Sequence, residues 1–244
     1  MSNELSGKPF LFKLTYDLVT TRGKTMTRNS SIYKGLFILM FPFIGTISQA
    51  ATVNITAEIE SVTVQHGDTQ VTIKRNQALD NTINPAYVKT SRKCPPFCIQ
   101  PASLAPGIDT IGELEVLDYL QRRGNGDDSA LIIDTRLADW VAKGTIPGST
   151  NIPWTTLNWE QDTDSITIGE MLQESFNAKN LRGLWDFSKA RTLILFCNGI
   201  WSGEASNSIL QLLKYGYPAH KIKWYRGGMQ SWESLGLTTI APVK

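Results

Sequence analysis

The stretch that decides the fold is L-I-L-F-C-N-G-I-W-S-G-E-A, Leu193–Ala205. Its first four residues are apolar and predict a short buried strand. A single cysteine, Cys197, ends this strand, and small residues with two glycines follow before a helical pattern begins. Ligands of parallel α/β sheets bind beyond the carboxyl ends of the strands, where loops lead into helices. The sequence therefore places Cys197 where a functional group is expected.

Strands and helices alternate on both sides of this stretch. A-L-I-I-D-T-R predicts a strand that carries Asp134 and Arg136 at its end. We expect one helix that begins at Thr110, its N-cap, with Glu113 three residues on. The other predicted elements are a helix at 138–144, a short strand near 150, a helix around 169–178, a helix ended by Gly216, a strand at 222–225 and a helix at 229–235. This alternation predicts an α/β fold with a central parallel sheet and helices on both faces.

A small extension precedes this domain. Residues 53–75 alternate Val, Ile and Thr around Gly67 and Asp68, which predicts a β-hairpin. His66 lies in the turn, and we expect it to be exposed and without a catalytic role. Residues 76–108 are irregular and contain C-P-P-F-C, so we place the extension and linker at 51–108 and the domain at 109–244.

The first fifty residues are typical of a leader. The apolar run 36–47 follows Arg28 and Lys34 and precedes S-Q-A-A, the layout of a secretory signal peptide cut after Ala50. The run is shorter than the ~20 residues that cross a bilayer, although a membrane anchor formed by an uncleaved leader is the alternative. Met26 is an alternative start. We expect a periplasmic or secreted bacterial protein with no stable membrane span after cleavage.

The charge balance excludes nucleic acid as a partner. Cleavage after Ala50 removes six of the 24 basic and two of the 22 acidic side chains, which leaves a net charge of −2. No basic cluster remains to neutralise phosphates. Two close cysteines and two distant histidines do not readily supply the ligands of a metal site, and we expect no cofactor.

The three cysteines divide into a pair and a single thiol. Cys94 and Cys98 lie four residues apart, and Cys197 is about a hundred residues away, so in an oxidising compartment Cys197 is the free thiol. For the pair, three interpretations stay open: a structural or strained disulfide, a redox or persulfide relay that exchanges with Cys197, and a metal site.

The loop after Cys197 is built to hold an anion. Its two glycines let successive backbone N–H groups turn inward at the start of a helix. The same field stabilises a thiolate and predicts a cysteine pKa below the ordinary ~8.5. The alternative is that Cys197 is a buried structural residue. The predicted binding loop comprises Asn198, Gly199, Ile200, Trp201, Ser202 and Gly203.

Four motifs in this order resemble the rhodanese domain over about residues 109–240. They are A-L-I-I-D-T-R with G-T-I-P-G-S-T-N-I-P, then F-C-N-G-I-W-S-G, K-Y-G-Y-P and Y-R-G-G-M-Q-S-W. The resemblance implies a sulfurtransferase in which Cys197 takes sulfane sulfur from a small donor, holds it as a persulfide and passes it to a thiol acceptor. It implies structural roles for Asp134 and Arg136.

This sequence departs from the family pattern at three points. Thr145 stands where histidine is usual, and the spacing from Cys197 to Gly216 is longer than usual. The end of the loop carries Ser202 and Glu204 instead of the Arg or Lys of many thiosulfate-using members. Thiosulfate is therefore in question as a donor, a phosphatase is disfavoured, and Arg226 is the candidate anion contact.

Two other functions remain in competition with sulfur transfer. One is a catalytically inactive rhodanese-like binding or regulatory module, in which Trp154, Trp159 and Trp185 bind a partner protein, for example in the periplasm. The other is a thiol redox protein that uses Cys94 and Cys98. Within the loop, Trp201 either shields a persulfide from water or packs against a neighbour.

Overall fold

The computed structural model describes residues 52–94, 98–158 and 165–241. The predicted leader and Trp159 lie outside these residues. The strands are β1 Ser61–His66, β2 Thr69–Lys74, β3 Asp109–Ile111, β4 Ala130–Asp134, β5 Thr150–Asn151, β6 Lys179–Leu181, β7 Leu184–Asp186, β8 Thr192–Phe196 and β9 Ile222–Tyr225. The α-helices are α1 Glu113–Gly124, α2 Ala138–Val141, α3 Ser165–Glu170, α4 Glu204–Lys214 and α5 Gly228–Ser234. Short 3-10 turns lie at Pro85–Tyr87, Trp154–Leu157 and Ala219–Lys221, and a π-helical turn at Met171–Ser175 continues α3.

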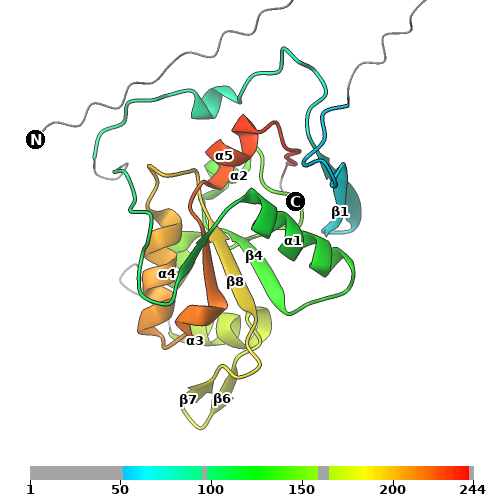
Figure 1. The fold of residues 1–244 in the computed structure, drawn as a ribbon. Helices are drawn as coiled ribbons and strands as arrows, with labels where there is room; N and C mark the ends of the chain where they lie inside the picture. Colours follow the sequence, from blue (N-terminus) through cyan, green and yellow to red (C-terminus); the bar gives the residue numbers. More distant parts are fainter. Residues whose placement is uncertain (1–51, 95–97, 159–164, 242–244) are drawn as a thin grey trace, which may run out of the picture. The chain divides into compact units, whose positions relative to one another are not determined.

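Five parallel strands form the central sheet in the order β3-β9-β8-β4-β5 (Figure 1). Strands β4 and β8 lie at its centre, where Asp134 is aligned with Phe196. The residue after each strand therefore stands at the same edge of the sheet, and Cys197 is one of these residues. The predicted parallel sheet is confirmed.

Alternate residues of the central strands pack on opposite faces, because successive side chains of a strand point to opposite sides. Leu131 and Ile133 of β4 face α3 and α4, whereas Ile132 faces α1 and α5 (Figure 1). Each helix contributes an apolar stripe, for example Ile209 and Leu212 of α4. This burial on both faces fits the continuous apolar runs of β4 and β8.

The N-terminal hairpin β1–β2 is present, as its alternating sequence predicts. Val62, Val64 and Ile73 from its inner face pack in the same apolar cluster as α1 and α5. The prediction that His66 is exposed is wrong. His66 is buried, and its Nδ1 accepts a hydrogen bond of 3.1 Å from the backbone N–H of Gly148, so the hairpin packs on the domain through this turn.

Two further details differ from the sequence-based prediction. Thr110 is not a helix cap: it lies in β3, and Gly112 is the N-cap of α1, with its N–H donated to the Glu115 carboxylate. Strands β6 and β7 form a second hairpin in a segment for which the sequence predicted only a loop.

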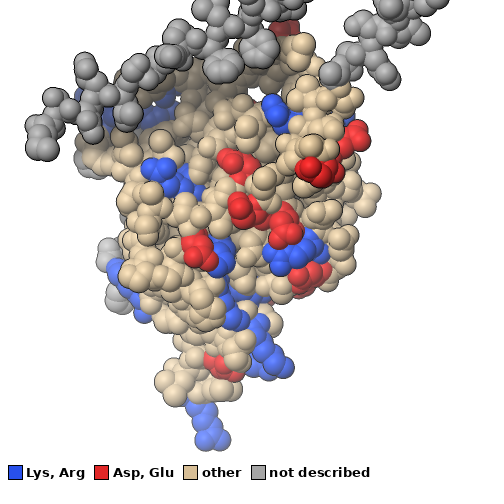
Figure 2. All heavy atoms as spheres, viewed as in Figure 1, with Lys and Arg blue, Asp and Glu red and all other residues tan. Residues whose placement is uncertain are grey.

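The charged side chains are mixed over the face drawn in Figure 2, where Lys and Arg alternate with Asp and Glu. Within the described part of the chain, no helix is both long enough and apolar enough to cross a lipid bilayer.

Candidate active site

Cys197 lies directly after β8, and its loop closes onto the first turn of α4. The loop is held from two sides. The hydroxyl and the N–H of Thr135 both donate to the carbonyl of Phe196, at 2.8 and 3.0 Å. The N–H groups of Met229 and Gln230, at the start of α5, donate to the carbonyls of Cys197 and Asn198 at 3.0 and 2.9 Å. The position of the cysteine is therefore fixed by two separate segments, the residues after β4 and the start of α5.

Gly228 allows α5 to approach the cysteine loop this closely. Its φ is +55°, and a Cβ placed on it would lie 2.3 Å from the carbonyl oxygen of Cys197 and 2.9 Å from the N–H nitrogen of Gly199. No side chain fits there without displacing the loop or the helix. The Gly-Gly pair before the last helix thus serves the geometry of the cysteine loop.

The sulfur of Cys197 is buried, with 2% of the residue exposed. Its thiol donates to the carbonyl of Ser202 at 3.6 Å, and the backbone N–H groups of Ala205 and Gly199 are directed toward the sulfur. Of these two N–H groups, that of Gly199 belongs to the predicted loop and that of Ala205 to the first turn of α4. The prediction of a lowered thiol pKa is wrong: burial raises the pKa of Cys197, the negative charge of Glu204 adds to the increase, and the amides offset only part of it.

Glu204 supplies a negative charge inside the loop. It is the first residue of α4, and its carboxylate accepts hydrogen bonds from the hydroxyl of Ser202 at 2.5 Å and the side-chain amide of Asn198 at 3.3 Å. Burial raises the pKa of this carboxyl group, while the Ser202 hydrogen bond opposes the increase. The Glu204 carboxylate therefore accepts hydrogen bonds from donors of the loop that would otherwise be available to a bound anion.

A pocket of about 460 Å³ opens beside the loop. It is lined by Ser202 and Gly203 of the cysteine loop, by Glu204 and Asn207 of α4, and by Leu137, Trp140 and Trp154. The wall is largely apolar except near Glu204. Its position next to the cysteine loop makes it the candidate substrate pocket, since ligand sites are concave and mostly apolar with a few polar groups.

Asp134 and Arg136 form a buried ion pair at the end of β4. Arg136 donates to both carboxylate oxygens of Asp134, at 2.8 and 2.6 Å, and also to the hydroxyl of Tyr87 at 2.8 Å and the carbonyl of Gly144 at 2.8 Å. Thr145 donates its hydroxyl to Asp134 at 2.7 Å, so the residue that replaces the family's usual histidine still closes the network. These contacts tie β4, α2 and the following loop together.

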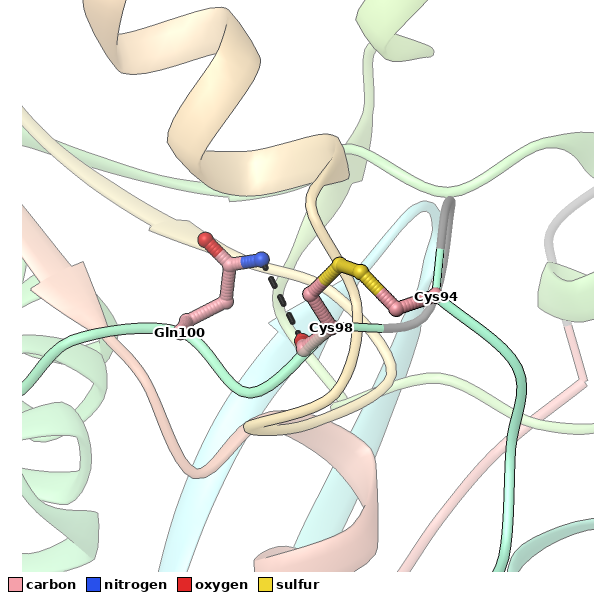
Figure 3. The surroundings of a disulfide bond; sticks show 3 residues. All are labelled: Cys94, Cys98 and Gln100. Carbon is pink, nitrogen blue, oxygen red and sulfur yellow. Dashed lines mark hydrogen bonds between the residues drawn. A yellow bond between two sulfur atoms is a disulfide. The ribbon is translucent and has the colours of Figure 1, made fainter.

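Arg92 and Gln100, on either side of the cysteine pair, contact residues of the cysteine loop. The N–H of Gln100 donates to the carbonyl of Ile200 at 2.7 Å, and its side-chain oxygen accepts from Ser206 at 3.1 Å. Cys94 and Cys98 form a disulfide just before it, and Gln100 also donates to the carbonyl of Cys98 (Figure 3). We call residues 92–94 and 98–100 the strap.

Arg226 and Trp201 both contact the strap, at Gln100 and Arg92 respectively. The Arg226 guanidinium donates twice to the carbonyl of Gln100, at 3.2 and 2.6 Å, and Arg226 is not among the described residues that line the pocket. The Trp201 indole donates to Gln230 at 2.8 Å, and the Arg92 guanidinium lies 3.5 Å from the centre of a Trp201 ring. These contacts indicate that Trp201 packs against neighbouring residues.

Sequence reasoning missed Glu204, Gln100 and Gly228 as parts of the site. A signal existed for Glu204, an acidic residue in the first turn of the helix that follows the cysteine. For Gly228 the signal was the Gly-Gly pair before the last helix. No local pattern marks Gln100, which reaches Ile200 from 100 positions earlier in the chain.

Comparison with known proteins assigns the domain. The family model named rhodanese-like domain matches residues 116–235. The search of curated proteins gives no significant match. Among solved structures, a human single-domain sulfurtransferase is 21% identical, with 50% of this chain and 93% of that chain covered and a TM-score of 0.33.

Two other solved structures are similarly distant. A rhodanese-like domain from Anabaena sp. is 17% identical, with coverage of 54% and 78% and a TM-score of 0.35. A thiosulfate sulfurtransferase from Pseudomonas aeruginosa is 19% identical, with coverage of 56% and 21% and a TM-score of 0.37. By this match, residues 116–235 of the chain form a rhodanese-like domain.

Proposed function

We propose that this protein is a sulfurtransferase that carries sulfane sulfur as a persulfide on Cys197. The observation that carries the proposal is the setting of this thiol: it ends a central parallel strand, two backbone N–H groups are directed toward its sulfur, and a pocket opens beside its loop. Backbone N–H groups in such a loop stabilise the negative charge that a thiolate or persulfide carries.

The chemistry needs no metal or redox cofactor. The Cys197 thiolate attacks the outer sulfur of a donor, the bond between the two donor sulfurs breaks, and the leaving group departs with the electron pair. A thiol acceptor then attacks the outer sulfur on Cys197, and the cysteine recovers its thiolate. Each step exchanges one sulfur bond for another, so the oxidation states balance.

The raised thiol pKa sets the working conditions of this reaction. At neutral pH most of Cys197 is protonated, because burial and Glu204 both favour the neutral thiol. Only the thiolate attacks, so the loading rate is expected to increase as the pH rises through and beyond the ordinary range of a cysteine. The carboxylate of Glu204 also repels anionic donors, which disfavours the doubly charged thiosulfate relative to donors of lower negative charge.

A transfer assay tests this function. The protein is incubated with an organic persulfide donor and a thiol acceptor, and formation of the acceptor persulfide is measured for the parent, Cys197→Ala and Cys94→Ser with Cys98→Ser. The proposal expects turnover in the parent and none above background in Cys197→Ala. Equal rates in these two proteins would refute it. Thermal unfolding of each variant controls for loss of the fold.

The burial of Cys197 favours a second candidate, an inactive rhodanese-like module. A thiol that is 2% exposed and has a raised pKa is typical of a packed core residue. In that case the domain binds a partner protein, and Trp154 and Trp185 are half-buried candidates for the contact. Absence of sulfur on Cys197 across a panel of donors, with the fold intact, would favour this candidate.

The proposal includes export of the protein. It rests on the apolar run at 36–47 and the small residues that follow it. In an oxidising compartment the Cys94–Cys98 disulfide would persist. Mass spectrometry of the mature protein tests this point, because cleavage after Ala50 predicts an N-terminus at Ala51.

A further inference from the structure

The pocket beside the cysteine loop combines aromatic walls with one negative charge. Trp140 and Trp154 contribute indole rings, and Leu137 fills the space near them. Glu204 is the only charged residue among the described residues that line this pocket. A pocket of this composition favours a positively charged group, because the face of an aromatic ring is negative and Glu204 provides a full counter-charge.

The buried cation Arg136 makes no hydrogen bond with the Glu204 carboxylate. Both carboxylate oxygens of Asp134 accept hydrogen bonds from Arg136, whose other side-chain hydrogen bonds go to Tyr87, Gly144 and Trp140. The donors to the Glu204 carboxylate are neutral: the hydroxyl of Ser202 and the amide of Asn198. A cation that enters the pocket would therefore meet a carboxylate that has hydrogen bonds and no ion pair among the described residues.

The aromatic cluster already attracts cations from the chain itself. The Lys143 ammonium lies 3.9 Å from the centre of a Trp140 ring, and the Arg92 guanidinium lies 3.5 Å from that of Trp201. The rings of Trp140 and Trp201 are neighbours, with centroids 5.9 Å apart. Of these two rings, that of Trp140 lines the pocket, so a ligand cation would share the Trp140 indole with Lys143.

Ser202 links this charge to the reacting sulfur. Its carbonyl accepts the hydrogen bond from the Cys197 thiol at 3.6 Å, and its hydroxyl donates to Glu204 at 2.5 Å. The carboxylate and the sulfur therefore flank one residue. Cys197 itself is not among the described residues that line the pocket, so a ligand bound there would have to reach the sulfur past Ser202.

We propose that the sulfur acceptor is a small aminothiol, whose ammonium group binds Glu204 between Trp140 and Trp154 while its thiol faces Cys197. This inference rests on the proposed function, because the acceptor discharges the persulfide. The acceptor thiolate attacks the outer sulfur, the bond from that sulfur to Cys197 Sγ breaks, and Sγ keeps the electron pair and takes up a proton. The products are the acceptor persulfide and the free Cys197 thiol.

Three acceptors of similar size and different charge test the inference: cysteamine, 2-mercaptoethanol and 3-mercaptopropionate. The protein is loaded with sulfur, and the rate at which Cys197 loses it is measured, relative to each thiol's rate with a small-molecule persulfide. Cysteamine is expected to be at least about tenfold faster than 3-mercaptopropionate, a ratio equivalent to roughly 1.4 kcal/mol. Equal relative rates for all three, or the reverse order, would overturn the proposal.

Variants at Glu204 assign the preference to this carboxylate. Glu204→Gln is expected to bring the three relative rates to within about twofold, Glu204→Asp to keep the order, and Glu174→Gln, a change at an exposed helical glutamate, to behave as the parent. An unchanged preference in Glu204→Gln would contradict the assignment. Thermal unfolding shows whether each variant is folded.

A binding measurement separates this inference from the proposed function. Ethylammonium and propionate, which carry no sulfur, are titrated into Cys197→Ala and followed by the indole N–H signals of its NMR spectrum. The inference expects saturable binding of ethylammonium but not of propionate, and loss of this binding in Glu204→Gln. This result would support a cation-binding pocket even if no persulfide ever forms. No difference between the two probes would refute the pocket, even where Cys197 of the parent carries sulfur.

Discussion

Replacement of Gly228 by alanine tests the idea that α5 holds the cysteine loop by close backbone contact. A Cβ at this position would lie 2.3 Å from the carbonyl oxygen of Cys197, about 1 Å inside an ordinary carbon–oxygen contact. The helix or the loop must therefore move. That movement separates the N–H groups of Met229 and Gln230 from the two loop carbonyls that they now contact.

The expected loss of stability has two sources. A φ of +55° costs an alanine about 1 kcal/mol relative to glycine. Weakening of the two backbone hydrogen bonds adds about 1 kcal/mol each. The free energy of unfolding should therefore fall by about 3 kcal/mol, which corresponds to a decrease of roughly 6–12 °C in Tm for a domain of this size.

Gly126→Ala is the matched control. Gly126 also has a positive φ, +93°, but nothing lies within 4 Å of a Cβ built on it. This variant should lose only the conformational contribution of about 1 kcal/mol. Thermal unfolding of both variants gives the comparison, and alkylation of Cys197 reports loosening of the loop. If the two variants unfold at the same temperature, the argument from close contact is wrong.

Three further predictions concern the charges and the cysteine pair. The rate of Cys197 alkylation by iodoacetamide should rise with pH through a midpoint above the ordinary ~8.5, and Glu204→Gln should lower this midpoint because the carboxylate charge favours the protonated thiol; a midpoint below 8 in the parent would contradict the reasoning. Asp134→Asn should destabilise the fold by about 3–5 kcal/mol, since it leaves the Arg136 charge buried without its partner, while the exposed Asp139→Asn should stay within about 0.5 kcal/mol in denaturant unfolding. Replacement of both Cys94 and Cys98 by serine should leave sulfur loading of Cys197 intact if the disulfide is structural; loss of transfer to the acceptor with normal loading would instead identify a relay.

Strands β4 and β8 could be predicted because each is a short, largely apolar run, as expected for a strand buried on both faces. Strand β9 could be predicted because it is rich in β-branched and aromatic residues, although it contains Lys223. Strand β3 could not. It has three residues, Asp109–Ile111, and lies at the edge of the sheet, where its side chains are largely exposed and follow no apolar pattern. The hairpin β6–β7 escaped prediction for the same reason, since most of its residues are exposed.

The position of Cys197 could be predicted from the sequence, but the direction of its pKa shift could not. Sequence shows that backbone N–H groups stand near the sulfur, which lowers a thiol pKa. Burial of the sulfur depends on the packing of distant segments, and the contact between Gln100 and Ile200 is one example. The inward turn of Glu204 also depends on tertiary structure, because an acidic residue in the first turn of a helix commonly faces water.

The burial of His66 is a second feature that could not be predicted from the local sequence. A histidine next to a Gly-Asp turn is expected to be solvated, and the local sequence supports no other prediction. The end of β1 also contacts the domain, where a hydrogen bond from Gly148 and the surrounding residues bury the imidazole. Local patterns predicted the elements, and contacts between distant elements decided which polar side chains became buried.

Mass spectrometry of the peptide that contains Cys197 tests the central claim most directly. The protein is exposed to an organic persulfide donor at about pH 9, near the ordinary thiol range, without an acceptor, and its peptides are compared before and after addition of cysteamine. The account predicts one additional sulfur atom on Cys197 that disappears when the acceptor is added. A Cys197 peptide that gains no sulfur in the folded protein, while the donor remains intact and available, would contradict it.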